Sequence, residues 1–187
     1  MATSNDIKKG LCIEYSNDIF KVIEFLHVKP GKGPAFVRTK LKSVTNGKVI
    51  DNTFSAGHKI DEVKVITRKF QYLYEDDNGF HFMNNDDFSQ IYLNKEMIEN
   101  SQFMKAGEEV TIILKEADET PLSAEIPPTV YLDVIEADPG VKGNTATNAL
   151  KNAIVETGAR VMVPLFIEPG DKIKINTEDG SYLERVK

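Results

Sequence analysis

Residues 104–112 read MKAGEEVTI. In this stretch a glycine is followed by two acidic residues and then by Val110, Thr111 and Ile112, where apolar side chains alternate with a polar one. Glycine supplies the backbone freedom of a tight turn, and alternation is typical of a half-buried β-strand. The stretch therefore predicts a turn that leads into a β-strand.

The same pattern returns 63 residues later, where residues 167–175 read IEPGDKIKI. Self-similarity at a fixed spacing indicates a duplicated structural unit. The spacing is about the size of one small β-barrel, so we expect duplicated barrels in the second and third thirds of the chain. Two unrelated turn–strand units are the alternative explanation.

Strand signals dominate the remainder of the chain as well. Only residues 95–100 favour a short helix, and residues 149–156 are ambiguous between helix and strand. Short strands separated by turn residues indicate an all-β protein of small barrels or sandwiches. The expected strands lie at 20–28, 64–74, 110–114, 130–135, 161–167 and 172–176, and the expected turns are Asn46-Gly47, Asn78-Gly79, Thr157-Gly158 and Asp179-Gly180.

Proline marks one boundary between the expected domains. Residues 125–129 read EIPPT, which predicts a linker, and a softer boundary falls within residues 63–68. We therefore expect three domains, at residues 1–64, 65–127 and 128–187. Domains of this size bury little core each, so we expect them to lean on one another.

Charge is distributed unevenly along a chain whose formal net charge is −6. Residues 1–64 carry eleven Lys and Arg against seven Asp and Glu, whereas residues 65–127 carry five against thirteen. A net negative charge taken alone argues against a nucleic-acid partner. A basic first segment on an acidic body, however, can bind RNA at one end while phosphate repels the rest. Solubility alone is the other explanation of the asymmetry.

The sequence carries no signal for export or for membrane insertion. Residues 1–6 contain no apolar run, and the longest strongly apolar stretch, at 161–167, is far shorter than a membrane span and contains a proline. Cys12 is the only cysteine, so no disulfide can form within one chain. We expect a cytoplasmic protein with no membrane partner.

A bracket of proline and glycine surrounds one lysine in Pro30-Gly31-Lys32-Gly33-Pro34. Proline fixes φ near −65°, and glycine supplies the φ freedom that a tight turn needs. We expect a β-hairpin tip that projects Lys32 between small neighbours, where a base or another backbone can approach closely. An ordinary solvated turn lysine is the alternative.

The segment around this tip is basic. Residues 25–50 contain six Lys and Arg and His27, but no Asp or Glu. Strand alternation places Phe36 and every second residue after it on one face, which then forms a cationic stripe. Such a stripe suits contact with a phosphate backbone. The predicted RNA-binding residues are Lys29, Pro30, Gly31, Lys32, Gly33, Pro34, Arg38, Lys40 and Lys42.

Enzyme chemistry finds little support in the residues. His27, His58 and His81 match no metal-ligand spacing, and the glycines around Lys32 lack the spacing and the Ser or Thr of a phosphate-binding loop. Cys12 has no His–Asp arrangement nearby and is expected to be a small apolar strand residue. We predict a protein without catalytic residues, metal site or cofactor.

Two separated motifs resemble the bacterial elongation factor P family. The first is KPGKGPAF at residues 29–36, and the second is ETGARVMVPLFI at 156–167, continued by GDKIK at 170–174 and GSY at 180–182. The stretches YLDV at 131–134 and DPGVKG at 138–143 are also similar to family sequence. The resemblance extends through the whole chain.

The resemblance implies an N-terminal SH3-like (KOW-type) barrel followed by two OB-fold barrels, in an L shaped like tRNA. It also implies a translation elongation factor that binds the ribosome between the peptidyl and exit tRNA sites and relieves stalling at consecutive prolines. The implied partners are rRNA, ribosomal proteins and peptidyl-tRNA, and the bond-forming chemistry remains with the ribosome. We expect a monomer.

Lys32 matches the functional tip of that family, which reaches toward the acceptor end of the peptidyl-tRNA. The resemblance implies that this residue is enzymatically extended in many members, in some by β-lysylation, while others carry a glycosylated arginine at the position. An enzyme that modifies Lys32 is therefore a further expected partner.

One loop departs from the family pattern. Members begin a third-domain loop with Gly-Asp-Thr and further glycines, and use it near the exit-site codon and the small subunit. This chain has Gly143, Asn144 and Thr145 instead, followed by ATNA. The contact is either lost here or made by Asn and Thr hydrogen bonds.

On the residues alone, two other functions stay open. One is a general RNA-binding protein of the KOW/OB type, and the other is an enzyme with an unrecognised site.

Overall fold

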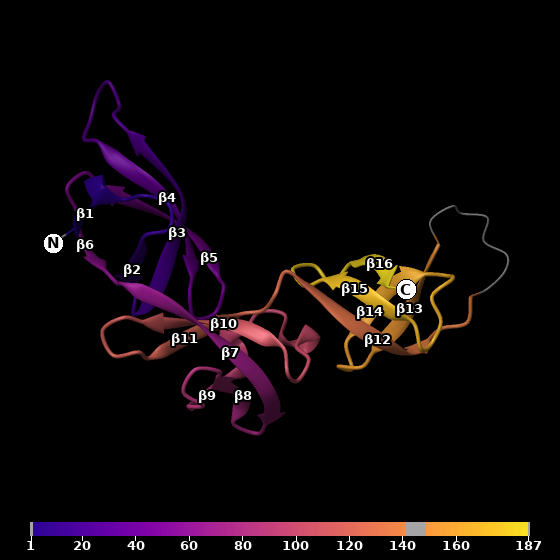
Figure 1. Ribbon diagram of the computed structural model, residues 1–187. Coiled ribbons are helices and arrows are strands. Elements are labelled where there is room, and N and C mark those ends of the chain that lie inside the picture. Colours follow the sequence, from indigo (N-terminus) through magenta and orange to yellow (C-terminus); the bar gives the residue numbers. More distant parts are fainter. Residues whose placement is uncertain (1, 141–148, 187) are drawn as a thin grey trace.

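The computed structural model describes residues 2–140 and 149–186. Over these residues the chain forms sixteen β-strands in three antiparallel sheets, with three short 3-10 helices. The N-terminal sheet stands above the middle one and the C-terminal sheet extends to one side, so the outline is an L (Figure 1). The predicted all-β class and L arrangement are confirmed. No helix within the described ranges is long and apolar enough to cross a membrane.

The N-terminal barrel has the strand order β1-β6-β2-β3-β4-β5. The hydroxyl of Ser4 donates to the carbonyl oxygen of Ser55 at 2.8 Å, which ties the β1 end of the sheet to the β5 end. Val22, Val37 and Leu41 are fully buried inside it. Its elements are β1 (Ala2–Thr3), η1 (Ser4–Asp6), β2 (Cys12–Tyr15), β3 (Asp18–Val28), β4 (Phe36–Ser43), β5 (Val49–Ser55) and β6 (Lys59–Glu62).

The middle barrel has the strand order β11-β10-β7-β8-β9. Alternating residues of its strands point inward, and Phe82, Val110 and Ile112 are fully buried. Its elements are β7 (Val65–Asp76), β8 (Gly79–Asn84), β9 (Gln90–Leu93), η2 (Lys95–Met97), η3 (Ser101–Phe103), β10 (Glu109–Lys115) and β11 (Pro121–Glu125).

The C-terminal barrel has the strand order β14-β13-β12-β15-β16 around a core that includes Leu132, Ile173 and Ile175. Counted within each barrel, the first strand is central and the order is 3-2-1-4-5 in both the middle and the C-terminal barrel. The strands are β12 (Thr129–Ala137), β13 (Leu150–Val155), β14 (Arg160–Pro164), β15 (Lys172–Asn176) and β16 (Tyr182–Val186).

The repeated turn–strand pattern occupies the same place in these two barrels. Gly107 and Gly170 precede the fourth strands, have φ of +89° and +92°, and donate their N–H groups to the carbonyls of Tyr72 and Val134 at 2.8 and 2.9 Å. In both barrels the register of the first strand shifts directly after this acceptor residue. The turn, its hydrogen bond and the bulge all recur, so the predicted duplication is confirmed.

Three local predictions need correction or completion. The helix expected at 95–100 is reduced to η2, because Ile98 at φ −131° and ψ 109° already has extended backbone, and Asn100 at φ +58° then separates η2 from η3. The ambiguous stretch at 149–156 is β-strand, as β13. The strand expected at 161–167 ends at Pro164, since proline has no N–H to continue the ladder. The four expected Gly-containing turns all connect neighbouring antiparallel strands.

Candidate functional site

The β3–β4 hairpin carries the predicted tip. Its strands pair from Phe20 with Ser43 to Val28 with Phe36, so residues 29–35 form the connecting loop. The hairpin projects from the N-terminal barrel on the side away from the middle barrel (Figure 1). Pro30 is half-buried, and the other tip residues are exposed: Lys29, Gly31, Lys32, Gly33 and Pro34.

The two tip glycines differ in what they contribute. Gly33 has φ of +110°, a conformation that side chains rarely adopt, so the loop requires glycine there. Gly31 lies outside that region, and a Cβ added to it would meet no atom of residues 2–140 or 149–186 within 4 Å. We expected both glycines to supply φ freedom, but only Gly33 does. The open space beside Gly31 is available to a partner.

Nothing among the described residues neutralises the tip lysines. No acidic side chain in those ranges lies within ion-pair distance of Lys29 or Lys32. Both side chains therefore present a full positive charge to solvent at the end of the hairpin.

The structure confirms the alternation along β4 but divides the stripe. Val37 and Leu41 point into the core, whereas Arg38 is exposed, with its guanidinium carbon 5.5 Å from the centre of the Phe36 ring. Lysines of the acid-free segment 25–50 nevertheless form ion pairs with acidic side chains outside it. Lys40 Nζ lies 3.5 Å from Glu24 Oε2, across the ladder on β3. The unpartnered positive charge is thus concentrated toward the tip.

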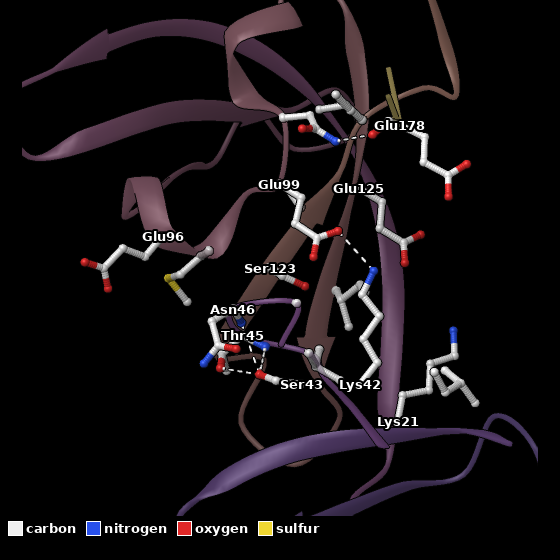
Figure 2. A pocket seen from close by; sticks show the side chains of 18 of the residues that line it. Lys21, Lys42, Ser43, Thr45, Asn46, Glu96, Glu99, Ser123, Glu125 and Glu178 are labelled. Atoms are coloured by element: carbon white, nitrogen blue, oxygen red, sulfur yellow. Dashed lines mark hydrogen bonds and ion pairs between the residues drawn. The ribbon is translucent and has the colours of Figure 1, made fainter. Parts of the chain in front are cut away.

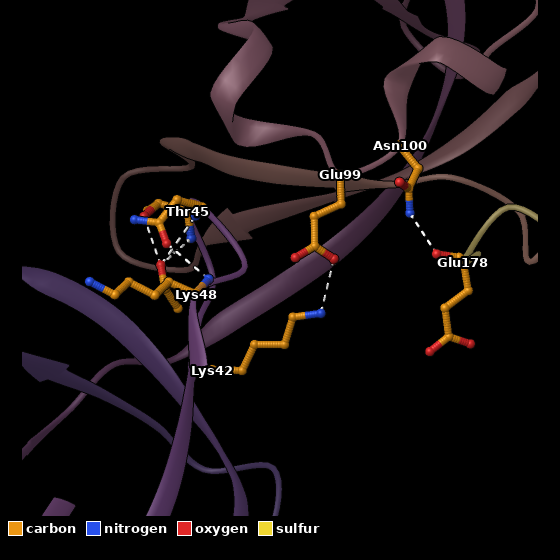
Figure 3. A network of polar contacts seen from close by, with 8 residues as sticks. Lys42, Thr45, Lys48, Glu99, Asn100 and Glu178 are labelled. Carbon is orange, nitrogen blue, oxygen red and sulfur yellow. Dashed lines mark hydrogen bonds and ion pairs between the residues drawn. The ribbon is translucent and has the colours of Figure 1, made fainter. Parts of the chain in front are cut away.

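Lys42 lies at the opposite end of β4, where the N-terminal barrel meets the middle barrel. Its Nζ is 3.0 Å from Glu99 Oε2, a contact between the two barrels (Figure 3). Beside this pair is an open cavity of about 690 Å³, to which all three barrels contribute (Figure 2). The structure therefore does not bring Lys42 together with the tip, although the sequence grouped them on one stripe.

The middle and C-terminal barrels join through a more apolar contact. Phe103 of η3 is 3% exposed and belongs to the C-terminal core. Asn100 Nδ2 donates to the carbonyl oxygen of Glu178 at 3.2 Å (Figure 3). These contacts fix the C-terminal barrel on the middle one by packing as well as by hydrogen bonding.

A partly buried ion pair reinforces the same joint. Lys105 Nζ lies 2.8 Å from Glu156 Oε1, and the same oxygen accepts the N–H of Asp133 at 3.0 Å. Burial raises the pKa of Glu156, but the hydrogen bonds from Lys105 and Asp133 outweigh it, so the pKa lies below its ordinary value. The hydrogen bond to Glu156 likewise raises the pKa of Lys105.

Two apolar residues near the tip were missed in the sequence. Phe25 and Leu26 lie toward the hairpin end of β3 and are 40% and 59% exposed. They border an open groove of about 440 Å³ together with Arg38 and Lys40. The signal was available: residues 25–28 are nearly all apolar or aromatic and face a basic strand instead of alternating with polar residues.

The remaining candidate residues have other placements. Cys12 is buried, and burial raises the pKa of its thiol, which fits a small apolar strand residue. Within the described ranges no three His, Cys, Asp or Glu side chains are grouped closely enough to hold a metal ion. Gly143, Asn144 and Thr145 lie outside the described residues.

Comparison with protein families matches each barrel separately. Residues 3–60 match "Elongation factor P (EF-P) KOW-like domain", residues 65–123 match "Elongation factor P (EF-P) OB domain", and residues 130–185 match "Elongation factor P, C-terminal". The KOW-like and OB descriptions, with the strand order shared by the second and third barrels, confirm the predicted fold.

Full-length relatives and solved structures agree. The chain is 61% identical over 187 residues to elongation factor P of Christiangramia forsetii and 50% identical to elongation factor P 1 of Porphyromonas gingivalis, each covered completely. A solved eukaryotic translation initiation factor 5A from Methanococcus jannaschii covers 67% of this chain and 90% of its own, with a TM-score of 0.50 and 18% identity. That likeness concerns the fold alone.

Proposed function

Because this chain belongs to the elongation factor P family, and is therefore a translation elongation factor, we propose that it binds the ribosome between the peptidyl and exit tRNA sites and stimulates peptide-bond formation at polyproline-stalled ribosomes. The observation that carries this proposal is Lys32, an exposed cation at the end of a hairpin that projects away from the rest of the protein.

In this proposal Lys32 acts by positioning the reacting end of the peptidyl-tRNA. Its side chain reaches toward the acceptor end of the peptidyl-tRNA, where a cation stabilises the phosphate backbone and limits the orientations of the reacting ester. Correct orientation of reactants can supply several kcal/mol of a barrier, roughly 7–11 in the best intramolecular cases. Proline is a rigid, poor acceptor, so the benefit is largest there. The ribosome supplies the bond-forming chemistry, and the protein acts without catalytic residues or cofactor of its own.

The remaining tip residues support the same contact. Lys29 and Arg38 are exposed and add phosphate contacts around Lys32. Gly31 allows RNA to approach the backbone, since none of the described residues occupies the space beside it. Lys40 and Lys42 contribute less charge, because Glu24 and Glu99 pair with them. Asn144 replaces the family's acidic residue in this loop, and Asn144 and Thr145 offer hydrogen bonds near the exit-site codon.

Further features of the proposal follow from family membership. The protein works as a monomer in the cytoplasm, with rRNA, ribosomal proteins and peptidyl-tRNA as partners. A modifying enzyme can extend Lys32, whose exposure leaves its amine accessible. The three sheets use residues 2–62, 65–125 and 129–186, and we set the domain boundaries at 1–64, 65–127 and 128–187.

The test is reconstituted translation of two templates, one encoding Pro-Pro-Pro and one without consecutive prolines. Purified wild-type protein is compared with Lys32→Ala and with Lys48→Ala, a matched loss of an exposed lysine in the same barrel. We expect Lys32→Ala to lose most of the stimulation on the Pro-Pro-Pro template only, while Lys48→Ala behaves as wild type.

Equal behaviour of wild type and Lys32→Ala on both templates would overturn the role of the tip. Salt-dependent binding to any RNA, without preference for the ribosome, would instead support a general KOW/OB-type RNA-binding protein. Intact mass of the protein from its native cell separately determines the chemical state of Lys32.

A further inference from the structure

Three aromatic side chains lie in a row on the outer face of the middle barrel. Tyr74, His81 and Tyr92 are direct cross-strand neighbours on β7, β8 and β9. The rings of Tyr74 and His81 stack at 4.6 Å and 16°, and His81 is tilted against Tyr92 at 6.3 Å and 35°. We refer to these three residues as the aromatic ladder.

The fold does not account for the exposure of the aromatic ladder. Its two tyrosines are 52% and 60% exposed, while the core of the barrel is built from other aromatics, including Tyr72, Phe80 and Phe82. Cross-strand aromatic pairs stabilise a sheet, but that contact does not require two open ring faces. β8 and β9 lie on the side of the middle barrel away from the N-terminal barrel, so neither neighbour covers them (Figure 1). Exposed tyrosines of this kind are enriched at binding interfaces.

Acidic residues of the β7–β8 turn border the aromatic ladder beside its middle member, His81. Asp76 Oδ2 lies 2.9 Å from His81 Nε2, and Asp76 Oδ1 accepts the N–H groups of Asn78 and Gly79 at 2.8 and 3.2 Å. Asp77 follows in the same turn and is exposed. Asp76 is therefore held in place beside the ladder with its negative charge.

The charge of the surrounding barrel decides what kind of molecule fits. Residues 65–127 carry five Lys and Arg against thirteen Asp and Glu, and one of those lysines, Lys95, is paired with Glu75 near the ladder. Bases of single-stranded nucleic acid also stack on aromatic rings, but such binding relies on a positively charged groove for the phosphates. Here phosphate is repelled and a cation is attracted.

We propose that the aromatic ladder is a docking surface for an arginine-rich segment of a partner protein. The planar guanidinium stacks on a tyrosine face by cation–π contact, and the carboxylates of Asp76 and Asp77 pair with neighbouring arginines along the segment. Lysine fits less well, because its ammonium is strongly hydrated and cannot stack. This surface is separate from the hairpin tip and does not depend on the function proposed for Lys32.

Fluorescence anisotropy with the full-length protein tests the proposal. The probes are a labelled peptide of Arg-Gly-Gly repeats, its Lys-Gly-Gly counterpart, and a labelled oligouridine. The variants are Tyr74→Ala, Tyr92→Ala and Tyr92→Phe, and the matched control is Tyr131→Ala, which removes a tyrosine of similar exposure, 48%, from the C-terminal barrel. Circular dichroism verifies that each variant is folded.

We expect the arginine peptide to bind more tightly than the lysine peptide. Each ladder Tyr→Ala change should raise its Kd by about two- to fivefold, as expected for an exposed cation–π contact. Tyr92→Phe and Tyr131→Ala should leave the Kd unchanged. Ladder-dependent binding of oligouridine in place of the peptide would overturn the assignment in favour of RNA. Peptide binding that is absent, or that none of the ladder changes weakens, would also overturn it.

Discussion

The ring of Phe103, from the middle barrel, lies directly over Gly180 of the C-terminal barrel, so close that a Cβ on the glycine would sit 3.0 Å from Phe103 Cζ. Phe103 is almost fully buried there, so one barrel supplies part of the core of the next. The contact between these two residues makes the second joint of the protein a packed one.

Gly180→Ala should therefore destabilise the C-terminal barrel more than an equivalent change elsewhere. Gly180 and Gly158 have φ of +71° and +84°, so alanine is strained at both, at about 1–2 kcal/mol. Only at Gly180 does the new methyl also meet a neighbour. Urea unfolding should show a larger loss for Gly180→Ala than for Gly158→Ala, and equal losses would contradict the role of the Phe103 contact.

The joint between the first two barrels should be looser and sensitive to salt. Lys42 and Glu99 are both about half exposed, and such pairs contribute only about 0.2–1 kcal/mol. Lys42→Ala should broaden the distance distribution between spin labels at Lys59→Cys and Asn78→Cys, measured in a Cys12→Ser background. Lys48→Ala serves as the control. A distribution unchanged by Lys42→Ala would show that other contacts hold this joint.

Acid should weaken the joint between the second and third barrels. The pKa of Glu156 in the folded protein lies below its ordinary 4.5, so the stabilisation is complete above that value and is lost as the pH falls through the folded pKa. Lys105→Met should thus lower the free energy of unfolding at pH 7 but make a smaller difference in strong acid. In a Glu156→Gln background the effect of Lys105→Met on the free energy of unfolding should no longer become smaller as the pH falls. If it still does, a group other than Glu156 causes the pH dependence.

The two tip glycines should respond in opposite ways to alanine. Gly33→Ala should lower stability by about 1 kcal/mol or more, since its φ of +110° disfavours a side chain. Gly31→Ala should leave thermal stability unchanged or slightly raised. If Gly31→Ala nevertheless reduces the stimulation of translation on a Pro-Pro-Pro template, the added methyl group occupies space that RNA needs beside Gly31. Full activity of Gly31→Ala would show that no partner approaches there.

Local patterns predicted most of the strands and turns because those patterns act through neighbours in sequence. Gly107 and Gly170 revealed the duplication. Each glycine has a positive φ and lies only a few residues before an alternating strand, so a short stretch of sequence carries the whole pattern. The strand expected through Ile167 was too long because the apolar run hid the effect of Pro164. The charge partners could not be predicted from neighbouring residues, because Glu99 pairs with Lys42 although 57 positions separate them in the sequence.

The placement of the candidate site residues was predicted to a similar extent and for similar reasons. The bracket around Lys32 is local, so its exposure at a hairpin tip could be expected from the order of residues 30–34 alone. The division of the stripe could not, because it depends on Glu24 and Glu99 being brought to Lys40 and Lys42 by tertiary structure. The aromatic ladder needs strand register, and Tyr74, His81 and Tyr92 show no common motif in the sequence.

The placement of Lys42 has a mechanical consequence. It lies at the root of β4, and Phe36 at the other end of that strand is six residues away, about 20 Å at 3.3 Å per residue. A rotation of roughly 10° about the Lys42–Glu99 contact would displace Phe36 by about 3–4 Å, and Lys32 beyond it by more. The hairpin is thus a lever arm: a small tilt at a weak, salt-sensitive pivot becomes a movement of the tip as large as a hydrogen-bond length.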